Sequence, residues 1–121
     1  MAPSRILIID DNVNFAENIA EILQIEGHLT EIATSAEEAL SRALADRSEV
    51  VITDYRLPGI NGASLLRQLQ AMGLRVHAIV MSAYTDERTI ADARNAGATF
   101  VPKPIDFEAL GLALRVREGS A

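Results

Sequence analysis

The chain has 121 residues, of which 49% are hydrophobic, and it carries no cysteine and a formal net charge of −6 at pH 7. This length and composition predict one domain over residues 1–121 with a substantial core, and the lack of cysteine excludes disulfides, thiolate metal sites and cysteine nucleophiles. The scattered basic residues argue against direct nucleic-acid binding, and the lack of a long apolar stretch or signal peptide predicts a cytoplasmic chain that does not enter a membrane.

The first predicted elements are a buried strand and an amphipathic helix. Residues 6–9 form an unbroken apolar run, which is typical of a strand covered on both faces. Two carboxylates follow at once, and either Asp11 or Asn12 can cap the next helix. That helix is predicted because apolar residues recur at i, i+4, i+7 and i+8, with Gly27 as its stop. The stripe consists of Phe15, Ile19, Ile22 and Leu23.

The alternation continues through the middle of the chain. Residues 29–33 form a predicted strand whose threonine and glutamate suit the edge of a sheet. The sequence "TSAEEAL" starts a helix, with Ser35 as its N-cap and Glu38 completing a capping box. Residues 50–53 begin with an apolar run, which predicts a central strand.

The last part of the chain supplies two more strands and three more helices. A helix is expected over 63–72, with Gly73 as its stop, and a solidly apolar strand over 76–81. A further helix starts after Tyr84 and ends at "NAGA". The fifth strand is expected over 99–101, and the fifth helix follows "KPIDFEAL".

Five strands that alternate with five helices predict an α/β fold. Right-handed crossovers give a five-stranded, mainly parallel sheet with helices on both faces. The polar second strand and the short fifth strand suit the two edges, which agrees with the flavodoxin-like order 2-1-3-4-5. In that order a crevice opens between strands one and three, at their carboxyl ends.

Polar side chains follow the inner and last strands at this same edge of the sheet. They are Asp10 and Asp11 after the first strand, Asp54 after the third, Ser82 after the fourth and Lys103 after the fifth. Taken alone, the two adjacent aspartates also fit a solvated loop that caps a helix. With Asp54 they bring three carboxylates to one crevice, which requires a counter-ion. A hard divalent cation resolves the repulsion, and Mg²⁺ suits oxygen ligands that leave several waters in place.

These residue types also predict phosphoryl transfer. A carboxylate such as Asp54, placed beside Mg²⁺, can attack phosphorus and form an aspartyl phosphate. Phosphoryl transfer depends on positioning and charge neutralisation, which the metal and the Lys103 ammonium supply. The hydroxyl of Ser82 can donate to a third phosphoryl oxygen.

Four segments, taken together, resemble the receiver domain of bacterial two-component response regulators. They are "ILIIDDN", "VVITDYRLPGINGASLL", "AIVMSAY" and "TFVPKPI", which occur in order and span nearly the whole chain. The resemblance implies that Asp54 is the phosphoacceptor. It also implies that Asp11 binds Mg²⁺ directly, that Asp10 does so largely through water, and that the backbone carbonyl of Arg56 supplies a further ligand.

The resemblance assigns the remaining site residues as well. Ser82 is the switch hydroxyl, with serine in place of the commoner threonine, and Lys103 pairs with the phosphoryl group. The Lys103–Pro104 peptide bond is expected to be cis. Phe100 matches an aromatic switch position, although a core residue of a short apolar strand is the alternative.

The implied partners are a sensor histidine kinase or a phosphotransfer protein, which donates the phosphoryl group. Asn14, Phe15 and Asn18 are candidates for kinase choice, with Phe15 as a plain core residue the alternative. Phosphorylation is expected to change the face formed by the fourth helix, fifth strand and fifth helix, which can contact an effector domain or a second copy. Leu112 and Val116 belong to that face, because they lie off the predicted core-facing stripe of Phe107, Leu110 and Leu114.

Two other functions are weighed against this one. A small Mg²⁺-dependent phosphohydrolase with an aspartyl intermediate would carry a second acid two residues after Asp54, where Arg56 stands. A phosphorylation-independent interaction module would not need the full set of carboxylates, hydroxyl and lysine. We therefore expect a signalling domain and not an enzyme, with at most slow self-phosphorylation and self-dephosphorylation.

Overall fold

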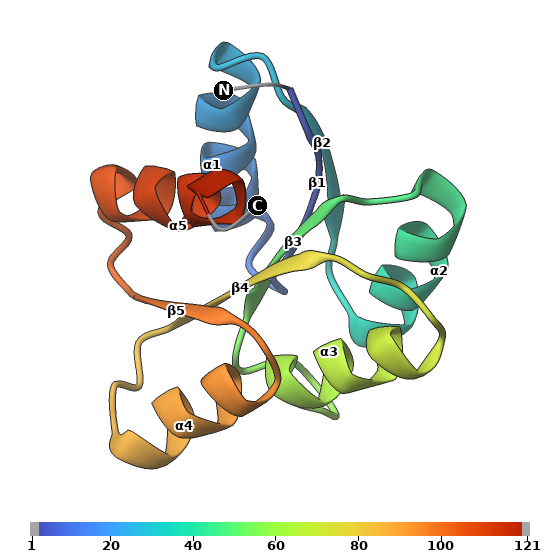
Figure 1. Ribbon diagram of the computed structural model, residues 1–121, viewed down its shortest axis with the longest axis vertical. Helices are drawn as coiled ribbons and strands as arrows, with labels where there is room; N and C mark the ends of the chain where they lie inside the picture. The colour runs from blue at the N-terminus through green and yellow to red at the C-terminus, as the bar shows by residue number, and fades with distance from the viewer. Residues whose placement is uncertain (1–2, 120–121) are drawn as a thin grey trace.

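The computed structural model describes residues 3–119, with the side chains of residues 3–115. Five strands alternate with five helices along the chain (Figure 1). The strands are β1 (Arg5–Ile9), β2 (Leu29–Ala33), β3 (Val50–Asp54), β4 (His77–Ser82) and β5 (Thr99–Pro102). The helices are α1 (Val13–Ile25), α2 (Ala36–Asp46), α3 (Gly62–Ala71), α4 (Glu87–Asn95) and α5 (Phe107–Gly119).

All strand pairs are parallel, and the sheet order is β2-β1-β3-β4-β5. Figure 1 shows α1 and α5 on one face of the sheet and α2, α3 and α4 on the other. The predicted fold class, strand order and two-sided cover are therefore confirmed.

The core has two layers because the central strands are buried on both faces. In β1, Leu7 and Ile9 pack toward α2 and α3, while Ile6 and Ile8 pack toward α1 and α5. This alternation explains why the sequence of β1 contains no polar position. The edge strand β2 differs, because Leu29 is exposed at its outer end.

Three strands end one residue later than the sequence predicts. β3 includes Asp54, β4 includes Ser82, and β5 reaches Pro102. The ladder continues past these ends, since the Tyr55 amide donates to the Met81 carbonyl at 2.7 Å and the Lys103 amide donates to the Ser82 carbonyl at 2.8 Å. The polar residues at the strand ends are therefore held by sheet hydrogen bonds and not by mobile loop backbone.

The helix N-termini are capped by side chains. Asn12 caps α1, because its Oδ1 accepts from the Phe15 amide at 3.1 Å, which decides between the two predicted caps. Ser35 caps α2 as predicted and accepts from the Glu38 amide. The Glu38 carboxylate reaches the Thr34 amide at 2.7 Å, one residue before the position that a capping box predicts.

The predicted stripe of α5 is wrong at one residue. Leu110 and Leu114 are buried, but Phe107 is 45% exposed, because it is the first residue of α5 and precedes the turns that pack on the sheet. Leu112 is 55% exposed and lies off the buried stripe, as predicted. The side chain of Val116 lies outside the described residues. Within residues 3–119, no helix combines the length and apolar character that crossing a bilayer requires.

Candidate functional site

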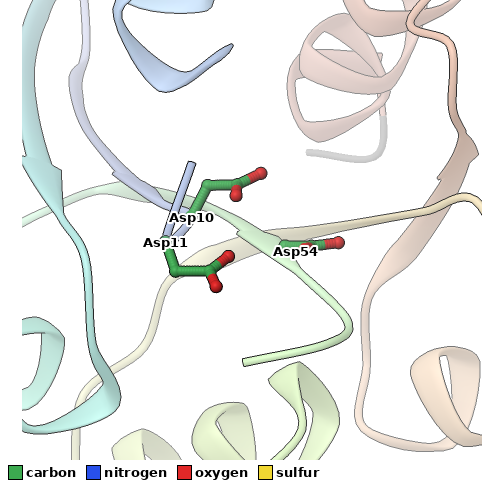
Figure 2. Close-up of side chains that lie close together, drawn as sticks. All are labelled: Asp10, Asp11 and Asp54. Atoms are coloured by element: carbon green, nitrogen blue, oxygen red, sulfur yellow. The ribbon is translucent and has the colours of Figure 1, made fainter. Parts of the chain in front are cut away.

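Three aspartates meet at the carboxyl ends of β1 and β3, beside the reversal of strand order. Asp10 and Asp11 follow β1, and Asp54 is the last residue of β3. Figure 2 shows their side chains pointing to the same side of the strand ends, and one carboxylate oxygen from each lies within 4.8 Å of the others. Asp10 and Asp54 are buried, whereas Asp11 is exposed at the rim.

Lys103 brings a positive charge into this cluster from the end of β5. Its Nζ lies 3.0 Å from Oδ2 of Asp10 and 3.5 Å from Oδ1 of Asp54. Burial raises the pKa of Asp54 above its ordinary value, the Lys103 ammonium opposes this effect, and the charge of Asp10 adds to it. One ammonium thus compensates the cluster only in part. The peptide bond between Lys103 and Pro104 is cis.

The acidic cluster fits a hard divalent cation. All its side-chain donors are carboxylate oxygens, the ligand type that Mg²⁺ prefers. Asp10 is held in place by the Asn12 amide, which donates to its Oδ1 at 2.9 Å, and by Lys103 at Oδ2. Exposed Asp11 offers a ligand on the solvent side, so a hydrated ion can enter there.

The Ser82 hydroxyl lies on the neighbouring strand. Asp54 pairs with Met81 in the parallel register, so Ser82 stands one position beyond that pair. Ser82 is fully buried, and its Oγ accepts from the Tyr84 amide at 2.9 Å. This bond uses a lone pair of the oxygen and leaves the hydroxyl proton for another acceptor.

Gly62, whose role was not predicted from the sequence, packs against the backbone of the site. Its amide donates to the Tyr55 carbonyl at 2.7 Å and closes the loop after β3. A Cβ atom at Gly62 would lie 2.6 Å from the Asp54 carbonyl oxygen and 3.0 Å from Cγ2 of Thr53. Only glycine therefore allows α3 to start this close to the strand end.

The family model of the response regulator receiver domain matches residues 6–115. The chain belongs to this family. A response regulator receiver protein of Anaeromyxobacter sp. (strain Fw109-5) is 39% identical over 102 residues, which cover 84% of this chain and 43% of that protein. Sporulation initiation phosphotransferase F of Bacillus subtilis (strain 168) is 28% identical over 109 residues, covering 89% of this chain and 88% of that protein.

Solved structures support the same assignment. A CheY-like response regulator receiver domain protein from Methanospirillum hungatei JF-1 matches with a TM-score of 0.86 at 26% identity, over 99% of this chain and 100% of that one. The chain is thus a receiver domain of two-component signalling, and the phosphohydrolase alternative is not favoured. It spans less than half the length of the Anaeromyxobacter relative.

In this receiver domain, Phe100 and the residues predicted for kinase choice lie outside the cluster of three aspartates. Phe100 is half-buried in β5 and packs against the core layer under α3 and α4. Asn14 and Asn18 are exposed on α1, and Phe15 between them is half-buried against the other core layer. The Cζ atom of Arg56 lies 4.2 Å from the centroid of the Tyr84 ring. In the sequence, Arg56 follows closely after Asp54, and Tyr84 follows closely after Ser82.

A hydrogen-bonded bridge links the receiver site to α4. The hydroxyl of Tyr55, the residue after Asp54, donates to Oδ2 of Asp92 at 2.7 Å. Arg67 of α3 donates to Oδ1 of the same carboxylate at 2.7 Å. Hydrogen bonds from Arg67 and then from Tyr55 hold the pKa of Asp92 below its usual range. No periodic pattern in the sequence signals this bridge, since its members come from three separate elements.

Proposed function

We propose that Asp54 accepts a phosphoryl group from a phosphohistidine of a partner histidine kinase or phosphotransfer protein. The observation that carries this proposal is the position of the Asp54 carboxylate, 3.5 Å from the Lys103 ammonium and inside a cluster of three aspartates. The name of the Bacillus relative, a phosphotransferase, supports a place in a phosphorelay. We place this transfer in the cytoplasm, which the lack of cysteine permits, since the chain needs no disulfide.

Mg²⁺ is the proposed cofactor, with Asp10, Asp11, Asp54 and the backbone carbonyl of Arg56 as its ligands. The three side chains fit this role because their oxygens converge within 4.8 Å. When bound, the ion supplies positive charge to the oxygens of the transferred group. Asp10 is oriented for ligation by the Asn12 amide, so it keeps its position whether or not Lys103 stays bound.

The transfer needs no proton to leave the protein. An ionised oxygen of Asp54 bonds to phosphorus while the bond from phosphorus to the donor's imidazole nitrogen breaks, and that electron pair stays on the nitrogen. Lys103 opposes the rise in the pKa of Asp54 and so favours the ionised nucleophile. The same ammonium can then pair with a phosphoryl oxygen, and the Ser82 hydroxyl can donate to another.

The output is proposed to be a change on the face of α4, β5 and α5. A phosphoryl group adds charge and acceptor oxygens beside Ser82, which draws the hydroxyl inward. Phe100 can then move into the space beside β5. Exposed Leu112 on α5 supports contact with an effector domain or a second copy. Self-dephosphorylation is expected to be slow, because the site carboxylates serve as ligands and not as a base.

Phosphorylation by acetyl phosphate with Mg²⁺ tests the acceptor. Intact-protein mass spectrometry should show one phosphoryl group on the wild type and none on Asp54→Asn. Asp46→Asn is the matched control and should be labelled normally, because Asp46 lies at the end of α2, where its carbonyl accepts from Arg5 at the start of β1. Labelling that survives in Asp54→Asn would refute the assignment.

Partner choice can be tested by comparing phosphoryl transfer from the cognate kinase with labelling by acetyl phosphate. Substituting Asn14 and Asn18 should slow transfer from the cognate kinase but not from acetyl phosphate, because both side chains are exposed on α1. Equal slowing with both donors would instead indicate damage to the site.

A further inference from the structure

Lys103 has an aromatic contact in addition to its two carboxylates. Its Nζ lies 4.2 Å from the centroid of the Phe15 ring, in the geometry of a cation–π interaction. Phe15 stands in the first turn of α1 and is half-buried. Its amide donates to Oδ1 of Asn12, and the Asn12 amide donates to Asp10. One helix cap therefore fixes both the ring and a carboxylate that hold the ammonium.

The three contacts of Lys103 respond differently to a bound metal. Asp10 and Asp54 are the carboxylates that the proposed Mg²⁺ would also use, so a cation weakens both ion pairs with Lys103. The Phe15 ring is not a ligand for a hard cation, so its contact with the ammonium does not compete with the metal. A lysine side chain has four flexible carbons. Without the ring contact, Lys103 would be free to leave the site once the metal has weakened its ion pairs.

We propose that Phe15 is a positioning residue for phosphoryl transfer that acts through Lys103. It keeps the ammonium above the site when the carboxylates bind the metal, so that the ammonium meets the incoming phosphoryl group. This role rests on the proposed function, but it differs from kinase choice because it operates with any phosphodonor. It differs from core packing because it depends on the aromatic face and not on apolar volume.

The first test measures the rate of labelling by acetyl phosphate with Mg²⁺ and no kinase. Phe15→Leu keeps an apolar helix-forming side chain but removes the ring, and should slow labelling about fivefold, the factor that a partly desolvated cation–π contact supplies. Phe15→Tyr keeps the ring and should restore the rate. Ile32→Ala, in β2 and half-buried against the same core layer as Phe15, is the control for lost packing and should not slow labelling.

The second test needs neither metal nor activity. Lys103 is the only lysine of the chain, so protein made with ¹³C-lysine gives one set of lysine side-chain NMR signals. In the metal-free wild type, the ring should shift the Lys103 methylene protons upfield. Phe15→Leu should return them to ordinary values, whereas Phe15→Tyr and Ile32→Ala should leave them shifted.

The outcomes separate the proposal from its rivals. Lysine signals that are the same in wild type and Phe15→Leu would overturn it, and so would labelling of Phe15→Leu at the wild-type rate. Equal slowing by Ile32→Ala would assign the effect to packing and overturn the positioning role. Failure of the proposed function would give a different result. The wild-type protein would then take up no phosphoryl group, but its lysine signals without metal would still show the contact with the Phe15 ring.

Discussion

Replacing Gly62 by alanine should distort the site without removing any of its chemical groups. The added Cβ would lie 2.6 Å from the carbonyl oxygen of Asp54, closer than any relaxed contact allows, and the obstructing atom is backbone. Either α3 or the end of β3 must therefore shift. Because β3 is held on both sides by β1 and β4, the shift falls on the loop that carries Arg56.

The change in the free energy of unfolding follows from two opposing contributions, the cost of crowding and the gain in helix propensity. Forcing one extra carbon into a packed region costs about 1–3 kcal/mol. Alanine regains at most about 1 kcal/mol over glycine in a helix interior, and less at Gly62, which is the first residue of α3. The free energy of unfolding should therefore fall by about 1–2 kcal/mol.

Gly111 in α5 provides the matched control. Among the described residues, a Cβ atom there would meet only the Nη1 of Arg115, at 3.5 Å, which is an ordinary contact with a flexible side chain. Gly111→Ala should therefore stabilise the protein by about 0.5–1 kcal/mol. The same chemical change should thus have opposite signs at the two positions.

Urea denaturation of the wild type and both variants measures these differences. Acetyl phosphate labelling should be slowed in Gly62→Ala, because the displaced loop carries a proposed metal ligand, and unchanged in Gly111→Ala. The reasoning would be refuted if Gly62→Ala were as stable as the wild type, or if both variants shifted stability in the same direction.

Three further predictions concern the carboxylates and the switch. Mg²⁺ at ten times its dissociation constant should raise the free energy of unfolding by about 1.4 kcal/mol, and thermal melts should show that Asp11→Ala loses most of this gain. Asp54→Asn should stabilise the metal-free protein at pH 7, because burial raises the pKa of Asp54 and its ionised form costs stability. This gain in stability over the wild type should shrink as the pH falls through the raised pKa, because the wild-type carboxyl is then protonated. Urea titrations at several pH values measure the difference in the free energy of unfolding, and a difference that does not change with pH would contradict the prediction. Ser82→Ala should still be labelled at Asp54 but lose most of the change at α4 and α5. Backbone amide NMR with beryllofluoride tests this, and shifts around Phe100 and Leu112 like those of the wild type would show that the hydroxyl is not the trigger.

The sequence by itself determined the fold and the composition of the site. Apolar runs mark the central strands because a strand covered on both faces has no position for a polar side chain. Alternation of strands and helices then leaves few topologies, and parallel strands bring their carboxyl ends to one edge. Asp10, Asp54 and Lys103 could be placed together on that basis alone, since each follows a recognisable strand.

The contacts among those residues were decided only by the tertiary structure. Lys103 lies closer to Asp10 than to Asp54, and it also contacts the ring of Phe15. These contacts depend on how three separate loops leave the sheet. The close approach of Gly62 to the Asp54 carbonyl likewise depends on where α3 packs. Periodicity reports which face of an element is buried, because backbone geometry sets the repeat. Distances of a few ångströms between elements depend instead on packing and loop conformation, which no local pattern encodes, and these distances assign roles to the site residues.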